Sequence, residues 1–188
     1  MDVVRAIMRQ LKARGLIASG LSYGSAFSGV DLIAEAIDLE LGGKFAYEFA
    51  SESDAKLRGC LIHSWGARGL EEGRCHADAC GEEAMAEAGV DLFALTASCR
   101  PFSRRNHRST PEDRVEALTD VAAGLRYVSR AQPRLVLVEN VAEPCATGPI
   151  TGMLRRVPGY DLEMEEIDPR DVHVAVARAR QYWLLRRR

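Results

Sequence analysis

The spacing of apolar residues along this chain changes between two periods, one typical of helices and one typical of strands. In residues 3–14 the apolar positions recur every three to four residues, which predicts an amphipathic helix. Residues 91–97 and 135–138 are almost entirely apolar, as expected of strands buried on both faces of a parallel sheet. Helical spacing returns after Thr110-Pro111, a hydroxyl cap followed by proline, which predicts that a helix begins there.

The same reading extends over most of the chain. Further strands are expected at residues 24–28 and 44–50, and residues 160–167 and 180–185 are expected to form a closing antiparallel hairpin. Further helices are expected at 30–41, 54–60, 82–88 and 149–156. Residues 63–80 are rich in glycine and charge and predict no clear element. The alternation predicts an α/β fold with a mostly parallel sheet and helices on both of its faces.

Length and composition fit one folded unit. With 188 residues, of which 47% are hydrophobic, the chain suits a single domain spanning residues 1–188, with the helix within residues 1–20 packed on it. No apolar run is long enough for a bilayer, and the first residues lack a signal-peptide core, so we expect an intracellular protein without a membrane partner. Five cysteines without regular spacing favour free thiols over a disulfide framework.

Charge is distributed unevenly along the chain. The formal net charge is −2, which does not suit a protein that coats nucleic acid by charge alone. A basic segment nevertheless follows Cys99; it contains Arg100, Arg104, Arg105, His107 and Arg108. Such a segment suits a polyanionic substrate, and it equally suits an ordinary solvated loop.

Two candidate reactive groups follow two of the predicted strands. Cys99 lies in the loop after residues 91–97, and Glu139 ends the run that begins at residue 135. In open α/β sheets, chemistry is placed at the carboxyl ends of strands. A thiol and a carboxyl group delivered to the same edge form a possible covalent catalytic pair.

Five segments, in order along the chain, resemble motifs of the cytosine-C5 DNA methyltransferase family. Phe27-Ser28-Gly29 is similar to its cofactor loop, and residues 49–54 (FASESD) to its ribose-binding segment. Residues 99–103 (CRPFS) and 138–141 (VENV) are similar to its catalytic motifs, and residues 178–182 (RARQY) to its paired-arginine motif. Together they cover nearly the whole chain. Five such fragments in the expected order are more specific than any one alone.

The resemblance implies a Rossmann-like class I methyltransferase fold and a base-flipping DNA methyltransferase of the kind found in restriction-modification. Cys99 would add as a thiolate to C6 of cytosine, and a methyl group from S-adenosyl-L-methionine would then reach C5. Glu139, protonated, would hold N3 and the exocyclic amine of the base, and burial would favour that protonation. Arg180 would contact the base carbonyl, and Arg178 would support the loop or contact phosphate.

The resemblance also implies the residues around these groups. Phe27, Ser28 and Gly29 would shape the cofactor site, and Glu52 with Ser53 would lie at the ribose. Two further cofactor contacts are implied more loosely, Asp78 at the adenine amine and Phe102 at the methionine portion. The implied substrate-binding residues around Cys99 and Glu139 are Arg100, Ser103, Arg104 and Asn140, the last of which is also expected to fix its loop.

The chain departs from the family at several positions. Ser98 and Arg100 flank Cys99 where the family has proline and glutamine, and Val176 replaces a glutamine. Asp31 replaces a glycine of the cofactor loop, where a carboxylate would repel the carboxylate of the cofactor unless it pairs with the amino group of the cofactor. The family's target-recognition domain and closing helix have no counterpart here. A separate recognition subunit is therefore expected, and the helix at residues 3–14 either replaces the closing helix or is ordinary packing.

Three other interpretations remain open. In the first, the chain binds cofactor or nucleic acid as a catalytically degenerate accessory subunit, for which Asp31 and Ser98 are the best support. In the second, it acts on RNA, single-stranded DNA or nucleotides with the same chemistry. Finally, a cluster in the unassigned segment contains metal-ligand residue types, but its spacing matches no common zinc module, so no metal is expected; it consists of Cys60, His63, Cys75, His76 and Cys80.

Overall fold

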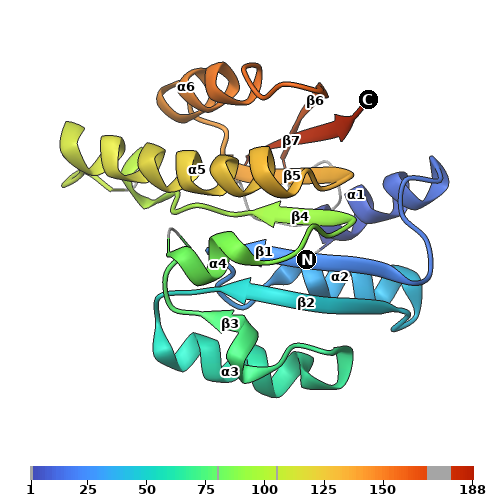
Figure 1. Cartoon of the computed structure of the whole chain (residues 1–188). Coiled ribbons are helices and arrows are strands. Elements are labelled where there is room, and N and C mark those ends of the chain that lie inside the picture. The colour runs from blue at the N-terminus through green and yellow to red at the C-terminus, as the bar shows by residue number, and fades with distance from the viewer. Residues whose placement is uncertain (1, 80, 105, 169–178) are drawn as a thin grey trace.

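A single sheet organises the molecule. The computed structural model describes residues 2–79, 81–104, 106–168 and 179–188, and in these ranges seven strands pair in the order β3-β2-β1-β4-β5-β7-β6 (Figure 1). The first five strands are parallel, and β7 is antiparallel to both β5 and β6. The strands are β1 (Leu21–Ala26), β2 (Phe45–Ser51), β3 (Cys75–His76), β4 (Leu92–Leu95), β5 (Leu135–Val141), β6 (Tyr160–Ile167) and β7 (Arg180–Arg187). The predicted α/β fold with a C-terminal antiparallel hairpin is confirmed.

The strand order places four loops at one edge of the sheet. After β1 the chain moves outward to β2 and β3 and then returns to β4 on the other side of β1. The last residue of β1, Ala26, pairs with Ser51 and with Leu95, and Leu95 pairs with Val138. The loops after β1, β2, β4 and β5 therefore leave the sheet close to one level. In an open α/β sheet this reversal of strand order is where ligands bind.

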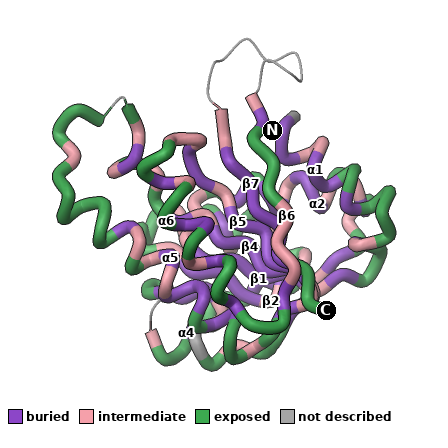
Figure 2. The backbone as a smooth tube through the Cα atoms, turned by 90° about the horizontal axis from the view of Figure 1, so that it is seen from above, coloured by how far each residue is buried: buried purple, intermediate pink, exposed green. Residues whose placement is uncertain are grey.

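Helices cover both faces of the sheet. One apolar cluster joins the sheet to α1 (Asp2–Ala13), α2 (Leu32–Leu41) and α3 (Ala55–Trp65). The other joins the opposite face to α5 (Pro111–Ala131) and α6 (Pro144–Leu154), and α4 (Glu82–Ala86) contacts β2. Figure 2 shows the central strands buried between these layers. Burial on both faces explains the apolar runs that predict β4 and β5.

The N-terminal helix packs as its periodicity predicts. Ile7, Met8 and Leu11 are buried against the sheet and α2. On the polar side, Arg5 and Arg9 form ion pairs with Glu40 of α2, at 2.8 and 3.3 Å. Helix α1 is therefore an integral part of one covering layer.

Helix α5 has the strongest local signals of the chain. The Thr110 side chain accepts a hydrogen bond from the backbone N–H of Asp113, whose side chain accepts one from the Thr110 N–H, forming a capping box. Midway along, Gly124 permits close approach to the sheet, because a Cβ there would lie 2.5 Å from a methyl of Leu95. The predicted start of this helix is confirmed. Of its apolar positions, Val121, Leu125 and Val128 are buried, whereas Val115 is exposed.

Several boundaries differ from the sequence-based expectation; α3, for example, continues to Trp65 instead of ending near residue 60. β1 spans Leu21–Ala26 instead of residues 24–28, because Ser22 and Ser25 hide an otherwise buried strand. α6 begins at Pro144 and includes Pro149, instead of beginning there. The unassigned segment contains the two-residue strand β3, too short to show a period, and two 3₁₀ turns (Gly66–Arg68 and Glu72–Arg74). Within the described ranges, no helix is long and apolar enough to cross a membrane.

Candidate functional site

The loop after β1 is unusual in its backbone conformation. Phe27, Gly29 and Asp31 all have positive φ angles, of 59°, 57° and 51°. Residues other than glycine rarely adopt this left-handed region, and such positions cluster at ligand sites. Ser28 is buried between them, and its backbone N–H donates to the carbonyl of Ser51 at 3.0 Å. The loop is thus tied to the end of β2.

Asp31 is buried beneath the loop after β1, and its carboxylate has partners within the protein, so it is not the exposed repulsive group that the sequence analysis expected. It is 5% exposed, and its carboxylate accepts hydrogen bonds from the Tyr23 hydroxyl at 2.9 Å and from the Tyr47 hydroxyl. It also caps α2 by accepting from the Ala34 N–H at 2.9 Å. Burial raises the pKa of Asp31, and these hydrogen bonds oppose the rise. The carboxylate therefore acts as a support beneath the loop.

The network below the loop continues through hydroxyl groups. Tyr47 and Ser28 each lie 2.6 Å from the Ser25 hydroxyl oxygen. Burial is the main reason that the pKa values of Tyr23 and Tyr47 are raised well above their ordinary value, and the nearby Asp31 carboxylate adds to it. Both phenols thus stay protonated and can donate. The sequence analysis missed Tyr23, Tyr47 and Ser25, because strand residues of these types carry no signal of a shared partner.

Glu52 joins the loops after β1 and β2. One carboxylate oxygen accepts from the Gly29 N–H at 2.8 Å, and the other from the Asp54 N–H at 2.9 Å. A carboxylate has about four acceptor positions, so capacity remains for the hydroxyls of a sugar. Open space lies where a Cβ of Gly29 would be. These features fit a nucleoside ribose held against the loop, as the resemblance implies.

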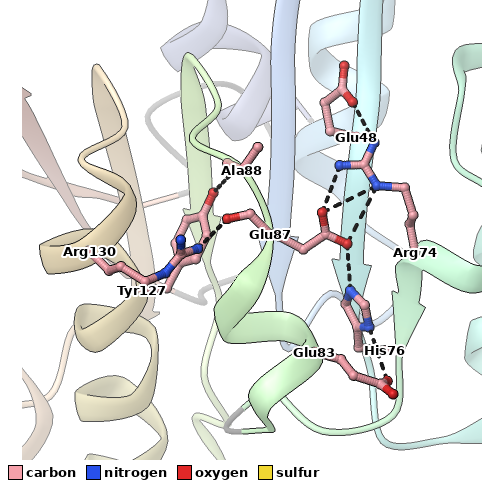
Figure 3. Close-up of polar contacts among 8 residues, drawn as sticks. All are labelled: Glu48, Arg74, His76, Glu83, Glu87, Ala88, Tyr127 and Arg130. Atoms are coloured by element: carbon pink, nitrogen blue, oxygen red, sulfur yellow. Dashed lines mark hydrogen bonds and ion pairs between the residues drawn. The ribbon is translucent and has the colours of Figure 1, made fainter.

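A polar network joins β3 to the end of α4 and to β2 (Figure 3). The imidazole of His76 lies 2.8 Å from the carboxylate of Glu87, which also pairs with Arg74 at 2.7 Å. Arg74 reaches Glu48 of β2 at 2.7 Å. The backbone carbonyl of His76 accepts the Glu52 N–H at 2.9 Å, so this network indirectly fixes the residue expected at the ribose.

The loop after β4 places Cys99 at the same edge as the loop after β1. The hydroxyl of Thr96 donates to the carbonyl of Phe27 at 2.8 Å and so links the two loops. Thr96 is another residue that the sequence analysis missed. Cys99 is half-buried and packs against the apolar cluster of α5 and α6. A 3₁₀ turn, Arg100–Phe102, follows directly. The thiol is therefore neither enclosed in the core nor fully exposed.

The ends of β5 and β7 bring the predicted carboxylate and arginine into contact. Arg180 Nε lies 2.6 Å from Glu139 Oε1, and both side chains are mostly buried. The neighbouring Asn140 is 1% exposed and donates to the carbonyl of Ala97 at 3.1 Å, two residues before Cys99. Asn140 thus fixes the Cys99 loop to β5, as expected. Arg178 and Val176 lie outside the described residues.

The other predicted substrate residues surround this loop. Arg100 and Arg104 are exposed, and Arg104 forms an ion pair at 2.6 Å with Glu143, in the segment after β5. Ser103 is half-buried. Of the predicted cofactor residues, Ser53 and Asp78 are exposed near the ends of β2 and β3, whereas Phe102 is buried in the apolar cluster.

The cysteine and histidine cluster of the unassigned segment does not assemble among the described residues. In those ranges, no group of three or more metal-ligating side chains could hold an ion. Cys60 is exposed on α3, whereas Cys75 is buried in β3, where burial raises the pKa of its thiol. Cys80 lies outside the described residues.

Comparisons with known proteins bear on the fold. No protein-family model matches the chain, and no curated protein matches it by sequence. Solved structures do match. A Dnmt2 methyltransferase from S. pombe aligns with 88% of this chain and 49% of its own, at a TM-score of 0.60 and 19% identity. An E. coli prophage protein described as a DNA modification methyltransferase aligns with 89% of this chain and 47% of its own. Its TM-score is 0.62 and its sequence identity is 18%.

A third similar structure is TrmN from Thermus thermophilus, which covers 98% of this chain and 49% of its own, with a TM-score of 0.61 and 16% identity. The chain therefore spans about half the length of these three proteins. At such identities the likeness concerns the arrangement of strands and helices. Together with the strand order and the antiparallel β7, it shows that this chain has the Rossmann-like fold of the methyltransferases.

Proposed function

We propose that this chain is the catalytic domain of an S-adenosyl-L-methionine-dependent methyltransferase that modifies C5 of cytosine in DNA. The observation that supports this proposal most is that two pairs of contacting residues lie at the same edge of the sheet. Gly29 and Glu52 form one pair, and Glu139 and Arg180 the other, with Cys99 on the loop that is linked to both. We propose that the five sequence motifs together form one site at this edge of the sheet.

The cofactor would lie at the loop after β1 and supply an electrophilic methyl group carried on a sulfonium. Glu52 accepts hydrogen bonds from ribose hydroxyls while it holds the N–H groups of Gly29 and Asp54. Phe27 and Ser28 shape the loop, and Ser53 and Asp78 lie at the exposed ends of the neighbouring strands. Phe102 contributes from within the apolar cluster, as a support for the site.

Cys99 acts as the nucleophile toward the base. Its thiolate forms a bond to C6 of cytosine, which makes C5 nucleophilic enough to take the methyl group. The C5 proton is then lost to a base, the C6–sulfur bond breaks, and the electron pair returns to sulfur as the ring double bond re-forms. Glu139 and Arg180 orient the ring, so an incoming base must share or displace the contact between them. Arg178 belongs to the same proposal.

The substrate contacts come from the loop after Cys99. Arg100 and Arg104 are exposed and suit phosphate groups, while Ser103 and Asn140 hold the loop on which they lie. Readout of a target sequence requires contacts beyond these loops, and we propose that a separate subunit supplies them. The S. pombe Dnmt2 methyltransferase and the E. coli prophage protein are each about twice as long as this chain.

The test combines cofactor binding with covalent trapping. We expect the protein to bind S-adenosyl-L-methionine in calorimetry and to form a denaturation-resistant adduct with a 5-fluorocytosine oligonucleotide. Cys99→Ser should abolish the adduct and lower methyl transfer by about a thousandfold or more, with cofactor binding retained. The matched control is Cys145→Ser, a second accessible thiol beyond β5. Glu139→Gln should lower transfer by about a hundredfold.

The substrate class follows from the same assay. Duplex DNA, single-stranded DNA, RNA and free nucleotides are compared, with and without any co-encoded protein. Transfer to RNA alone would move the proposal to RNA with the chemistry unchanged. Cofactor binding without any adduct would favour an accessory module, although Asp31, one of the two departures that support that alternative, is accounted for by its buried partners.

A further inference from the structure

Arginines gather at the edge of the sheet opposite the catalytic loops. Helices α5 and α6 and strand β7 run against the parallel strands, so all three end at this far edge, where Figure 1 places the C-terminal end of the chain. The cluster, called here the arginine surface, consists of Arg126, Arg130, Arg134, Arg155, Arg156, Arg186, Arg187 and Arg188. It accounts for much of the positive charge of a chain whose net charge is −2.

Hydrogen bonds hold the segments of this surface together. The Arg187 guanidinium donates to the carbonyl of Gln132, the residue that ends α5, at 2.8 Å, and its backbone N–H donates to Arg134 at 3.0 Å. The Arg188 N–H donates to the carbonyl of Gly159 at 3.0 Å. The Tyr160 hydroxyl donates to Pro133 at 2.6 Å. The arginines therefore project from a fixed scaffold.

Few carboxylates compensate this charge. Asp161 pairs with Arg188 at 2.8 Å and more distantly with Arg186, and Asp91 pairs with Arg134 at 3.5 Å. In the parts of the chain that the structure describes, no carboxylate pairs with the other members of the cluster, namely Arg126, Arg130, Arg155, Arg156 and Arg187. Arg130 donates to the backbone carbonyl of Glu87 and lies over the Tyr127 ring, and Arg187 donates to the carbonyl of Gln132, but these contacts do not neutralise charge. Exposed guanidinium groups without a carboxylate partner repel one another, so the surface favours an anionic partner.

The shape of the surface narrows the chemistry of that partner. A shallow depression of about 530 Å³ lies between α5 and α6. Leu125 and Met153 give it an apolar floor, and Arg126, Ser129 and Arg130 give it a polar rim. Guanidinium groups bind phosphate oxygens in a bidentate manner, and an apolar floor accepts a sugar or base. A phosphodiester chain carries both kinds of group.

We propose that the arginine surface binds the phosphodiester backbone of the nucleic acid at a distance from the catalytic loops. The inference rests on the proposed function for the identity of the substrate. The 21 residues of α5 span about 30 Å, so a duplex reaching from Cys99 to this surface needs about nine base pairs. Exposed acidic residues in the first half of α5, such as Glu112 and Glu116, separate the two basic regions, so this is a second contact.

The length of the nucleic acid provides the test. Binding is measured by fluorescence anisotropy over a range of salt concentrations, with a hairpin of about eight base pairs and a duplex of about 24 base pairs. The test variant is Arg155→Ala/Arg156→Ala. The matched control, Lys44→Ala/Lys56→Ala, removes two exposed positive charges that have no carboxylate partner among the described residues. Thermal melting verifies that both variants are folded.

The expected result separates the two duplexes. The test variant should bind the longer duplex about tenfold more weakly, and the slope of log K against log salt should become shallower by about 1.8, or 0.9 per lost contact. Its affinity for the short hairpin should be unchanged. Equal weakening of both lengths, or equal weakening by the control variant, would overturn the proposal.

Adduct formation on the short hairpin tests the proposed function independently of binding at the arginine surface. A length-dependent loss without any adduct would retain the arginine surface and reject the chemistry at Cys99. An adduct without length dependence would reject the surface and retain the chemistry. An RNA duplex of the longer length should show the same loss, because the contact is to the backbone; a loss confined to DNA would contradict this.

Discussion

The two halves of the candidate site are built differently. In the cofactor half, formed by β1, β2 and the loop at residues 27–31, the polar groups bond to one another inside the fold. Asp31, Tyr23 and Tyr47 are all buried, and their hydrogen bonds close on Ser25, Ser28 and the start of α2. In such a network each member fixes the positions of its partners.

The base half, formed by the ends of β4, β5 and β7, is held by fewer buried contacts. Cys99 is half-buried, and the arginines that follow it are exposed. Its buried anchors are Asn140, which donates to the carbonyl of Ala97, and the mostly buried pair of Glu139 and Arg180, whereas the contact between Arg104 and Glu143 lies at the surface. Under the proposed function, the contrast predicts a cofactor loop that is preorganised by the protein and a base half that is completed by its substrate.

The largest effect that tests this contrast is expected from Asp31→Ala. It removes the cap of α2, worth about 1 kcal/mol, and leaves the Tyr23 and Tyr47 hydroxyls without their acceptor, at about 1–3 kcal/mol each. The free energy of unfolding in urea should fall by about 4 kcal/mol. The counterpart in the base half, Cys99→Ser, should change it by about 1 kcal/mol or less. If both variants lowered the free energy of unfolding by similar amounts, the two halves of the site would not differ in how they are held.

A smaller effect is expected from pH. Because burial raises the pKa of Asp31 in the folded state, the unfolded chain releases this proton first, near the ordinary value of 3.8. Above that value the folded protein binds more protons than the unfolded chain, so stability falls as the pH rises through the raised pKa. We therefore expect the wild type to lose stability relative to Asp31→Asn as the pH rises above about 4, measured by urea unfolding. A relative gain would mean that the hydrogen bonds outweigh burial.

The sequence predicted those parts of the fold that depend on local pattern. The hairpin strand at residues 160–167 and helix α5 are confirmed closely, because alternation and a capping box lie within the segments themselves. Strand β3 was missed because its two residues acquire their strand geometry only by pairing with Ala50 and Ser51 of β2. Pattern cannot indicate an element of that length.

The candidate site divides along similar lines. The proximity of Cys99, Glu139 and Arg180 to one edge follows from their positions at strand ends, which the sequence provides. The burial of Asp31 does not follow, since an aspartate in a loop is usually exposed. Its environment depends on Tyr47, sixteen positions along the chain and brought near only by the pairing of β1 with β2.

The smallest expected effect concerns the surface contact of the base half. Arg104 is 80% exposed and lies 2.6 Å from Glu143, so the pair contributes at most about 1 kcal/mol to stability. If the base half is completed by its substrate, Arg104 must exchange this carboxylate for a phosphate. Glu143→Gln removes the competing charge and should therefore tighten binding of a short duplex about two- to threefold, whereas Arg104→Ala should weaken it by a similar factor. Anisotropy at low salt measures both, and melting temperatures should change little. If Glu143→Gln weakened binding instead, the contact would be part of a preformed site, and the two halves would be built alike.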